Sequence, residues 1–111
     1  MNQLNEKTFK DLDQMLNDIA EKFFLFKKIK ENPDLFLLSE GLNEEIISYD
    51  EFIYKVEKAY NSLDDNQKNL INNEFFYQSY HQWWTTLYSK ASFYRYKKAA
   101  MEKFLGAFYD I

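Results

Sequence analysis

From Ser89 to Phe108 the chain reads SKASFYRYKKAAMEKFLGAF, and this stretch decides which fold we expect. Apolar residues recur in it at spacings of three and four, as they do on the face of an α-helix that packs on a core. The residues of this face are Phe93, Tyr96, Ala100, Phe104 and Ala107. Ser89 is a good N-cap, because its hydroxyl can accept a hydrogen bond from an unpaired N–H of the first turn. The stretch therefore predicts an amphipathic helix that begins directly after Ser89.

The same helix has a basic face. Between residues 89 and 103, five basic side chains stand against the single Glu102, so the segment has a net charge of +4. The five are Lys90, Arg95, Lys97, Lys98 and Lys103. Because the helix dipole favours anions at a helix N-terminus, cations near that end indicate an external anion, and phosphate is the obvious candidate.

The composition favours one all-α domain over residues 1–111. A chain of 111 residues is long enough for one core, and its 2 Gly and 1 Pro scarcely interrupt helical propensity. With 0 Cys there is no disulfide framework, which fits an intracellular protein. No apolar run approaches the roughly 18 residues of a membrane span, and the N-terminus lacks the pattern of a signal peptide. We expect a cytoplasmic protein without a membrane partner.

Acidic residues are concentrated in the N-terminal part. The whole chain has a net charge of -4; residues 1–63 have 8 Lys against 13 acidic residues, and residues 64–111 have 6 basic against 5 acidic. This balance argues against indiscriminate nucleic-acid binding and confines any nucleic-acid face to the C-terminal helix.

The N-terminal part, residues 1–62, predicts two main helices. The first covers residues 5–31, with apolar side chains at helical spacing: Phe9, Leu12, Leu16, Ile19, Phe23 and Phe26. This seam either packs inside the domain, which we favour, or joins two copies, so we expect a monomer or a homodimer through this helix. Asn32-Pro33 should end the helix, and a short helix over 34–38 should stop at Gly41. Residues 42–47 are then a connector.

The next start signal is Ser48-Tyr49-Asp50-Glu51, which matches a capping box and predicts a helix to about Asn61. Its expected inner face is Phe52, Val56, Ala59 and Tyr60. In the C-terminal part, residues 62–65 should cap a helix with inward-facing Leu70, Ile71, Phe75 and Phe76. Residues 77–79 predict a break, and residues 80–88 a short helix with Trp83, Trp84 and Leu87 inside.

A short helix joined by a tight turn to a basic amphipathic helix is the order of a helix-turn-helix, so residues 63–111 predict a helix-turn-helix-like three-helix unit. From Leu63 to Phe104 the chain resembles the C-terminal promoter-recognising domain of bacterial sigma factors, and more closely the ArpU-type phage transcriptional regulators. The resemblance depends on Leu87-Tyr88-Ser89 and on the segment SKASFYRYKKAA that begins at Ser89. Small helix-turn-helix proteins of mycoplasmas have a similar C-terminal segment.

The resemblance implies a DNA-binding transcriptional regulator that acts through this unit, in contact with DNA or with RNA polymerase. The DNA-facing residues would be Lys90, Ala91, Tyr94, Arg95, Lys97 and Lys98. The arginine could pair with guanine or phosphate, and the lysines would supply the salt-dependent attraction to phosphates.

The alternative is a helical protein–protein interaction module that has lost DNA binding. The acidic N-terminal part favours it, as do Tyr88 and Trp84, which stand where this kind of unit usually has a glycine and a small residue. The more exposed tryptophan of Trp83 and Trp84 would be an interaction candidate, and we expect at least one of the two in the core. The sequence offers no spacing for a metal site around its one histidine, His81, and no catalytic motif or cofactor cradle. We therefore expect neither an enzyme nor a bound cofactor.

Overall fold

The computed structural model describes residues 7–32, 43–78 and 80–110. Within these ranges the chain is helical and has no β-strand, which confirms the expected all-α bundle. The elements are α1 (Phe9–Glu31), α3 (Asn43–Asn61), α4 (Asp65–Ile71), the π-helical turn η2 (Asn72–Phe76), the 3-10 turn η3 (Trp83–Thr86) and α5 (Lys90–Tyr109). None of the described helices is both long and apolar enough to cross a membrane.

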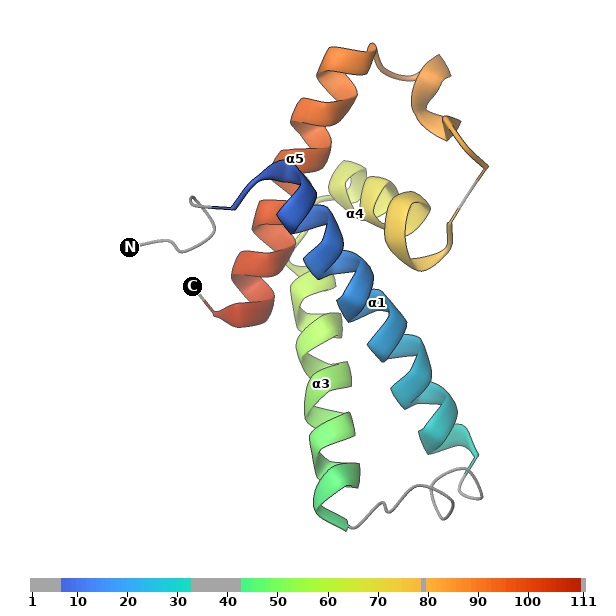
Figure 1. The fold of residues 1–111 in the computed structure, drawn as a ribbon, viewed down its shortest axis with the longest axis vertical. Helices are drawn as coiled ribbons and strands as arrows, with labels where there is room; N and C mark the ends of the chain where they lie inside the picture. Colours follow the sequence, from blue (N-terminus) through green and yellow to red (C-terminus); the bar gives the residue numbers. More distant parts are fainter. Residues whose placement is uncertain (1–6, 33–42, 79, 111) are drawn as a thin grey trace.

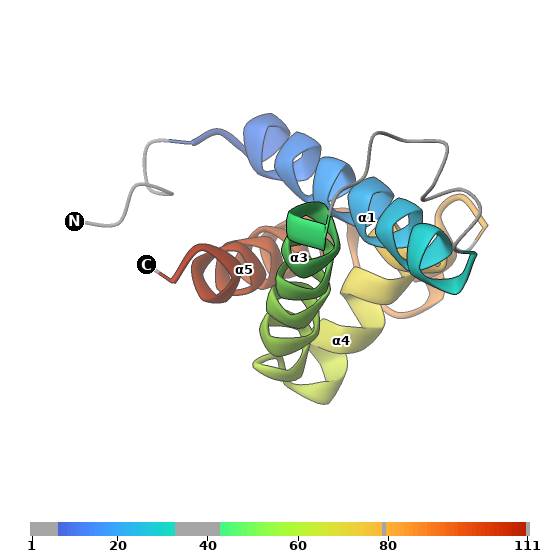
Figure 2. The ribbon, with the colours of Figure 1, turned by 90° about the horizontal axis from the view of Figure 1, so that it is seen from below.

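The helix α5 is the element that contacts most of the others. It packs against α1, α3 and α4, while α1 and α3 run beside each other in opposite directions (Figure 1). In the view from below, the C-terminal part of α5 and the helix α4 lie on different sides of α3 (Figure 2). Buried apolar side chains from α1, α3, α4 and α5, together with η2 and Trp83, form one continuous core.

The first helix confirms the expected seam and corrects its start. Lys7 and Thr8 are not helical, so the helix begins at Phe9, where Thr8 and Asp11 form a capping box. It ends at Glu31 with Asn32 as the C-cap, as expected. The seam residues Leu12, Leu16, Ile19 and Phe23 are buried against the chain's own helices. A homodimer through this seam would therefore have to open the bundle.

The helix α3 corrects the expected connector. It begins at Asn43, so residues 43–47 are helical and Ser48 lies inside the helix instead of capping it. The capping-box pattern of residues 48–51 therefore occurs inside a helix and does not mark its start. The end at Asn61 and the buried Val56 and Ala59 are confirmed, with Ile53 as a further buried residue. The short helix expected over 34–38, and its stop at Gly41, lie outside the described residues.

The C-terminal part departs from a standard helix-turn-helix. Asp64 caps α4 through a capping box with Gln67, and the four apolar residues expected inside α4 and η2 are buried. Tyr77 and Gln78 form the expected break, while Ser79 lies outside the described residues. The helix expected over 80–88 is wrong: only the four residues Trp83–Thr86 are helical, as one 3-10 turn. Gln82, directly before this turn, has a left-handed backbone conformation (φ 59°). This conformation does not occur inside a right-handed α-helix, so an α-helix cannot continue through Gln82.

The helix α5 begins after the Ser89 cap, as expected, but its buried face agrees only in part with the predicted one. Phe93, Ala100 and Phe104 are in the core, whereas Tyr96 is 47% exposed and Ala107 only partly buried. Met101, Leu105 and Phe108 are buried in their place. The sequence allows both stripes, and this one buries three large apolar side chains instead of a tyrosine and an alanine, so the hydrophobic effect favours it.

Candidate nucleic-acid interface

The first three turns of α5 present a strip of exposed side chains, which we call the α5 strip. Ala91, Arg95 and Lys98 follow one another at spacings of four and three and are exposed, so they share one face of the helix. Lys90 and Tyr94, both exposed, lie along its edge. The start of the helix is fixed by Ser89, whose hydroxyl accepts a hydrogen bond from the Ser92 N–H at 3.2 Å. Figure 1 shows this end of α5 extending beyond α3.

The cations of the α5 strip are not neutralised by acidic neighbours. Among the described residues, no ion pair includes Lys90, Arg95 or Lys98. The Arg95 guanidinium interacts with two residues of its own helix: it donates a hydrogen bond to Ser92 Oγ at 3.5 Å and lies 5.3 Å from the Tyr96 ring centroid. These three charges are therefore available to an anion from outside.

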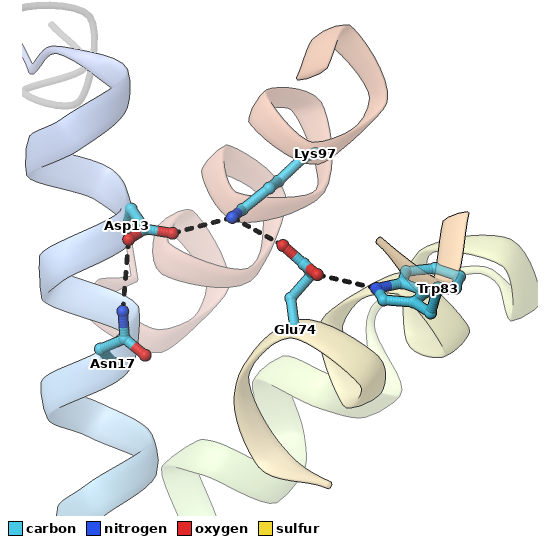
Figure 3. Close-up of polar contacts among 5 residues, drawn as sticks. All are labelled: Asp13, Asn17, Glu74, Trp83 and Lys97. Atoms are coloured by element: carbon cyan, nitrogen blue, oxygen red, sulfur yellow. Dashed lines mark hydrogen bonds and ion pairs between the residues drawn. The ribbon is translucent and has the colours of Figure 1, made fainter. Parts of the chain in front are cut away.

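Lys97 does not belong to this strip, which corrects its assignment to the exposed basic face. Lys97 is only 8% exposed, and its ammonium contacts Asp13 Oδ1 at 2.9 Å and Glu74 Oε1 at 2.8 Å (Figure 3). The other oxygen of Glu74 accepts a hydrogen bond from the Trp83 indole N–H at 2.7 Å. Asn17 donates to the second oxygen of Asp13 at 3.3 Å. Lys97 thus joins α5 to α1, to η2 and, through Glu74, to η3.

This group of side chains keeps Lys97 charged. Burial by itself would lower the pKa of Lys97, but the hydrogen bonds and negative charges of Glu74 and Asp13 outweigh it, so the pKa is raised above its ordinary value. The ammonium also lies 5.4 Å from the ring centroid of Phe9 and 5.2 Å from that of Phe75. The charge of Lys97 is therefore stabilised inside the protein and is not available to DNA.

Aromatic rings hold the start of α5 in place. Trp84 stacks on Phe93, with ring centroids 4.3 Å apart and planes 6° apart, and Tyr94 packs edge-on against Phe9 of α1 at 5.5 Å. Trp83 is 7% exposed and Trp84 half-buried, which confirms that at least one tryptophan is in the core. Leu87, expected to face inward, is 62% exposed because the turn that carries it is not an α-helix.

A cavity of about 520 Å³ opens beside this aromatic cluster, between α5 and the segment from η2 to η3. Its wall on α5 is formed by Lys90, Phe93, Tyr94 and Lys97, and the opposite wall includes both tryptophans and Glu74. His81 is exposed and also borders the cavity. The described residues contain no group of three or more metal-ligating side chains.

Sequence reasoning placed five of its six site residues on the surface correctly and missed the acidic partners of the sixth. A signal was present, because Lys97 lies four residues after Phe93 and four before Met101, on the line of the buried face. The partners Asp13 and Glu74 come from distant segments, and no local pattern links them to Lys97. Comparison with models of known protein families, with curated proteins and with solved structures finds no match to this chain.

Proposed function

We propose that this protein is a transcriptional regulator that binds duplex DNA through the α5 strip. The observation that supports it is the set of three exposed cations, Lys90, Arg95 and Lys98, on an end of α5 that extends beyond α3 and has no acidic partner among the described residues. The resemblance of this segment to helix-turn-helix regulators adds to it. RNA polymerase is a further partner that the resemblance implies.

The roles on DNA follow from side-chain chemistry. Arg95 is at the centre of the strip, and its guanidinium can donate two hydrogen bonds to guanine or to a phosphate. Lys90 and Lys98 lie eight residues apart, about 12 Å along the helix axis, and each suits one phosphate. Ala91 is small and permits close approach to a base or backbone. Lys97 has no role on DNA here, because its partners are inside the protein.

The test measures binding to fluorescent AT-rich and random-sequence duplexes by anisotropy over a series of salt concentrations. A triple variant with Lys90→Ala, Arg95→Ala and Lys98→Ala should bind much more weakly, and its log–log salt slope should be shallower by about 3 because three phosphate contacts are removed. The matched control carries Lys22→Ala, Lys28→Ala and Lys103→Ala, which removes the same charge from exposed lysines elsewhere. Equal losses in the two triple variants would contradict a defined DNA face.

The alternative, a protein–protein interaction module, is favoured by two other observations. A four-residue 3-10 turn stands where a helix-turn-helix has its preceding helix, and Leu87 and Tyr80 expose most of their surface nearby. Duplex binding by the wild-type protein decides between a DNA-binding regulator and a protein–protein interaction module. Absence of duplex binding at low salt would overturn the DNA proposal and direct attention to Leu87 and Tyr80 as contacts for a protein.

A further inference from the structure

The cavity beside α5 has the size of a small-ligand site. Its volume of about 520 Å³ lies within the range of roughly 300–1,000 Å³ that is usual for such sites. Polar side chains form the larger part of its wall, and its aromatic members are Tyr80, Trp83, Trp84, Phe93 and Tyr94, of which Trp83 and Phe93 are buried. Trp84 uses one ring face on Phe93 but stays half-buried, and Tyr94 is 42% exposed, so both retain ring surface for a ligand. Partly exposed aromatic rings of this kind can stack on a planar ring.

The polar groups of the cavity indicate what else the ligand carries. Lys90 borders it with an ammonium that has no ion-pair partner among the described residues, and α5 begins at this point, so the positive end of its dipole is nearby. The charges of Glu74 and Lys97 are already paired with each other. The unpaired charge on the cavity wall is therefore positive and suits an anion.

Hydrogen-bonding groups are also present along the rim. Within the described part of the chain, the side chains of His81 and Gln82 make no hydrogen bond, and both border the cavity. Asn73 uses its amide nitrogen on Asn69 and keeps its oxygen as an acceptor. Donors and acceptors of this kind can read the edge of a heterocyclic base.

From this combination we infer that the cavity binds a nucleotide, with the base against Trp84 and Tyr94 and the phosphate on Lys90. The inference does not require duplex binding by the α5 strip, although Lys90 and Tyr94 border both surfaces. The nucleotide can be free, or it can be one unstacked unit of a single strand, because bases in single strands stack on exposed aromatic rings in the same way.

Intrinsic fluorescence gives a direct test, since the chain has 2 Trp and both line this cavity. The protein is titrated with AMP, GMP, CMP and UMP and, separately, with ten-nucleotide strands of dT and rU. Quenching of tryptophan emission is expected. Because nucleotides also absorb light, isothermal calorimetry, which does not depend on absorbance, measures the same affinities independently. Saturation by free nucleotides identifies these as the source, whereas saturation by strands alone identifies a strand; both support the site. No saturable change with either overturns it.

Variants separate this site from the DNA proposal. Lys90→Ala should weaken nucleotide binding by roughly tenfold through loss of one charge-assisted hydrogen bond. The matched control Lys98→Ala removes an exposed lysine of the α5 strip that does not line the cavity, and it should leave nucleotide affinity unchanged while weakening duplex binding. Nucleosides should bind more weakly than nucleotides. Equal binding of the two, or equal effects of the two lysine variants, would overturn the assignment of the phosphate to Lys90.

Discussion

The two halves of α5 have different surroundings although they belong to one continuous helix. In the C-terminal half, Ala100, Met101, Phe104 and Leu105 are completely buried among the other helices. In the N-terminal half only Phe93 and Lys97 are buried, and the rest of the circumference is exposed or partly exposed. The C-terminal half of α5 is thus anchored in the core, and the N-terminal half is largely exposed to solvent. Substitutions should accordingly separate stability from binding, according to the half in which they lie.

The largest expected effect comes from the buried half. Phe104→Ala should lower the free energy of unfolding by about 4 kcal/mol, because it leaves a cavity in the core. Tyr96→Ala, an aromatic deletion on the exposed side, should lower it by less than about 1 kcal/mol. Urea denaturation followed by circular dichroism measures both values. Similar losses for the two variants would mean that the buried face of α5 includes Tyr96, as the sequence stripe predicted.

That pair of residues also shows how far sequence reasoning reaches. The helical class, the seam of α1 and the Ser89 cap follow from local spacing and capping chemistry, and the structure confirms them. The buried face of α5 does not follow, because apolar residues at 100–101 and 104–105 fit two stripes and only tertiary packing selects one.

The candidate site shows the same limit. The exposed cations at Lys90, Arg95 and Lys98 are predicted by the sequence of residues 89–103, but the burial of Lys97 depends on acids from two distant segments. The cavity depends on the path of residues 73–78 and 80–84, where a 3-10 turn replaces the expected helix. Backbone geometry of this kind has no signal at the level of residue spacing.

A second test concerns Lys97, which belongs to the N-terminal half by position but to the fold by its contacts. Lys97→Met should lower the free energy of unfolding by about 3 kcal/mol, because Asp13 and Glu74 would lose the positive charge that both of them contact. Lys98→Met, one residue further on the exposed side, should change it by no more than about 0.5 kcal/mol. Thermal or urea unfolding at neutral pH measures both. Equal effects would contradict the ion pairs of Figure 3.

The pH dependence of the Lys97→Met effect provides the control. Since the pKa of Lys97 is raised in the folded state, its charge stabilises the fold fully below the pKa of an unfolded lysine, about 10.4. This stabilisation is lost as the pH rises through the folded pKa. The difference between wild type and Lys97→Met should therefore be constant from pH 7 to about 10 and decrease above it. A decrease that begins near neutral pH would assign the effect to another group.

The smallest effect tests whether the exposed half of α5 is also the less stable half. Ser89→Ala removes the hydroxyl that caps Ser92 N–H and should cost about 1 kcal/mol. Because this end of the helix has fewer packed neighbours, the loss should be local: amides of residues 93–95 should exchange with solvent about fivefold faster, while those of residues 101–106 keep their rates. Hydrogen exchange measured by NMR resolves the two groups of amides. Thr8→Ala, which removes the cap of α1, is the matched control and should leave the exchange of residues 93–95 unchanged. Faster exchange in both halves after Ser89→Ala would mean that α5 opens as one unit, and its exposed end would then be as stable as the buried end.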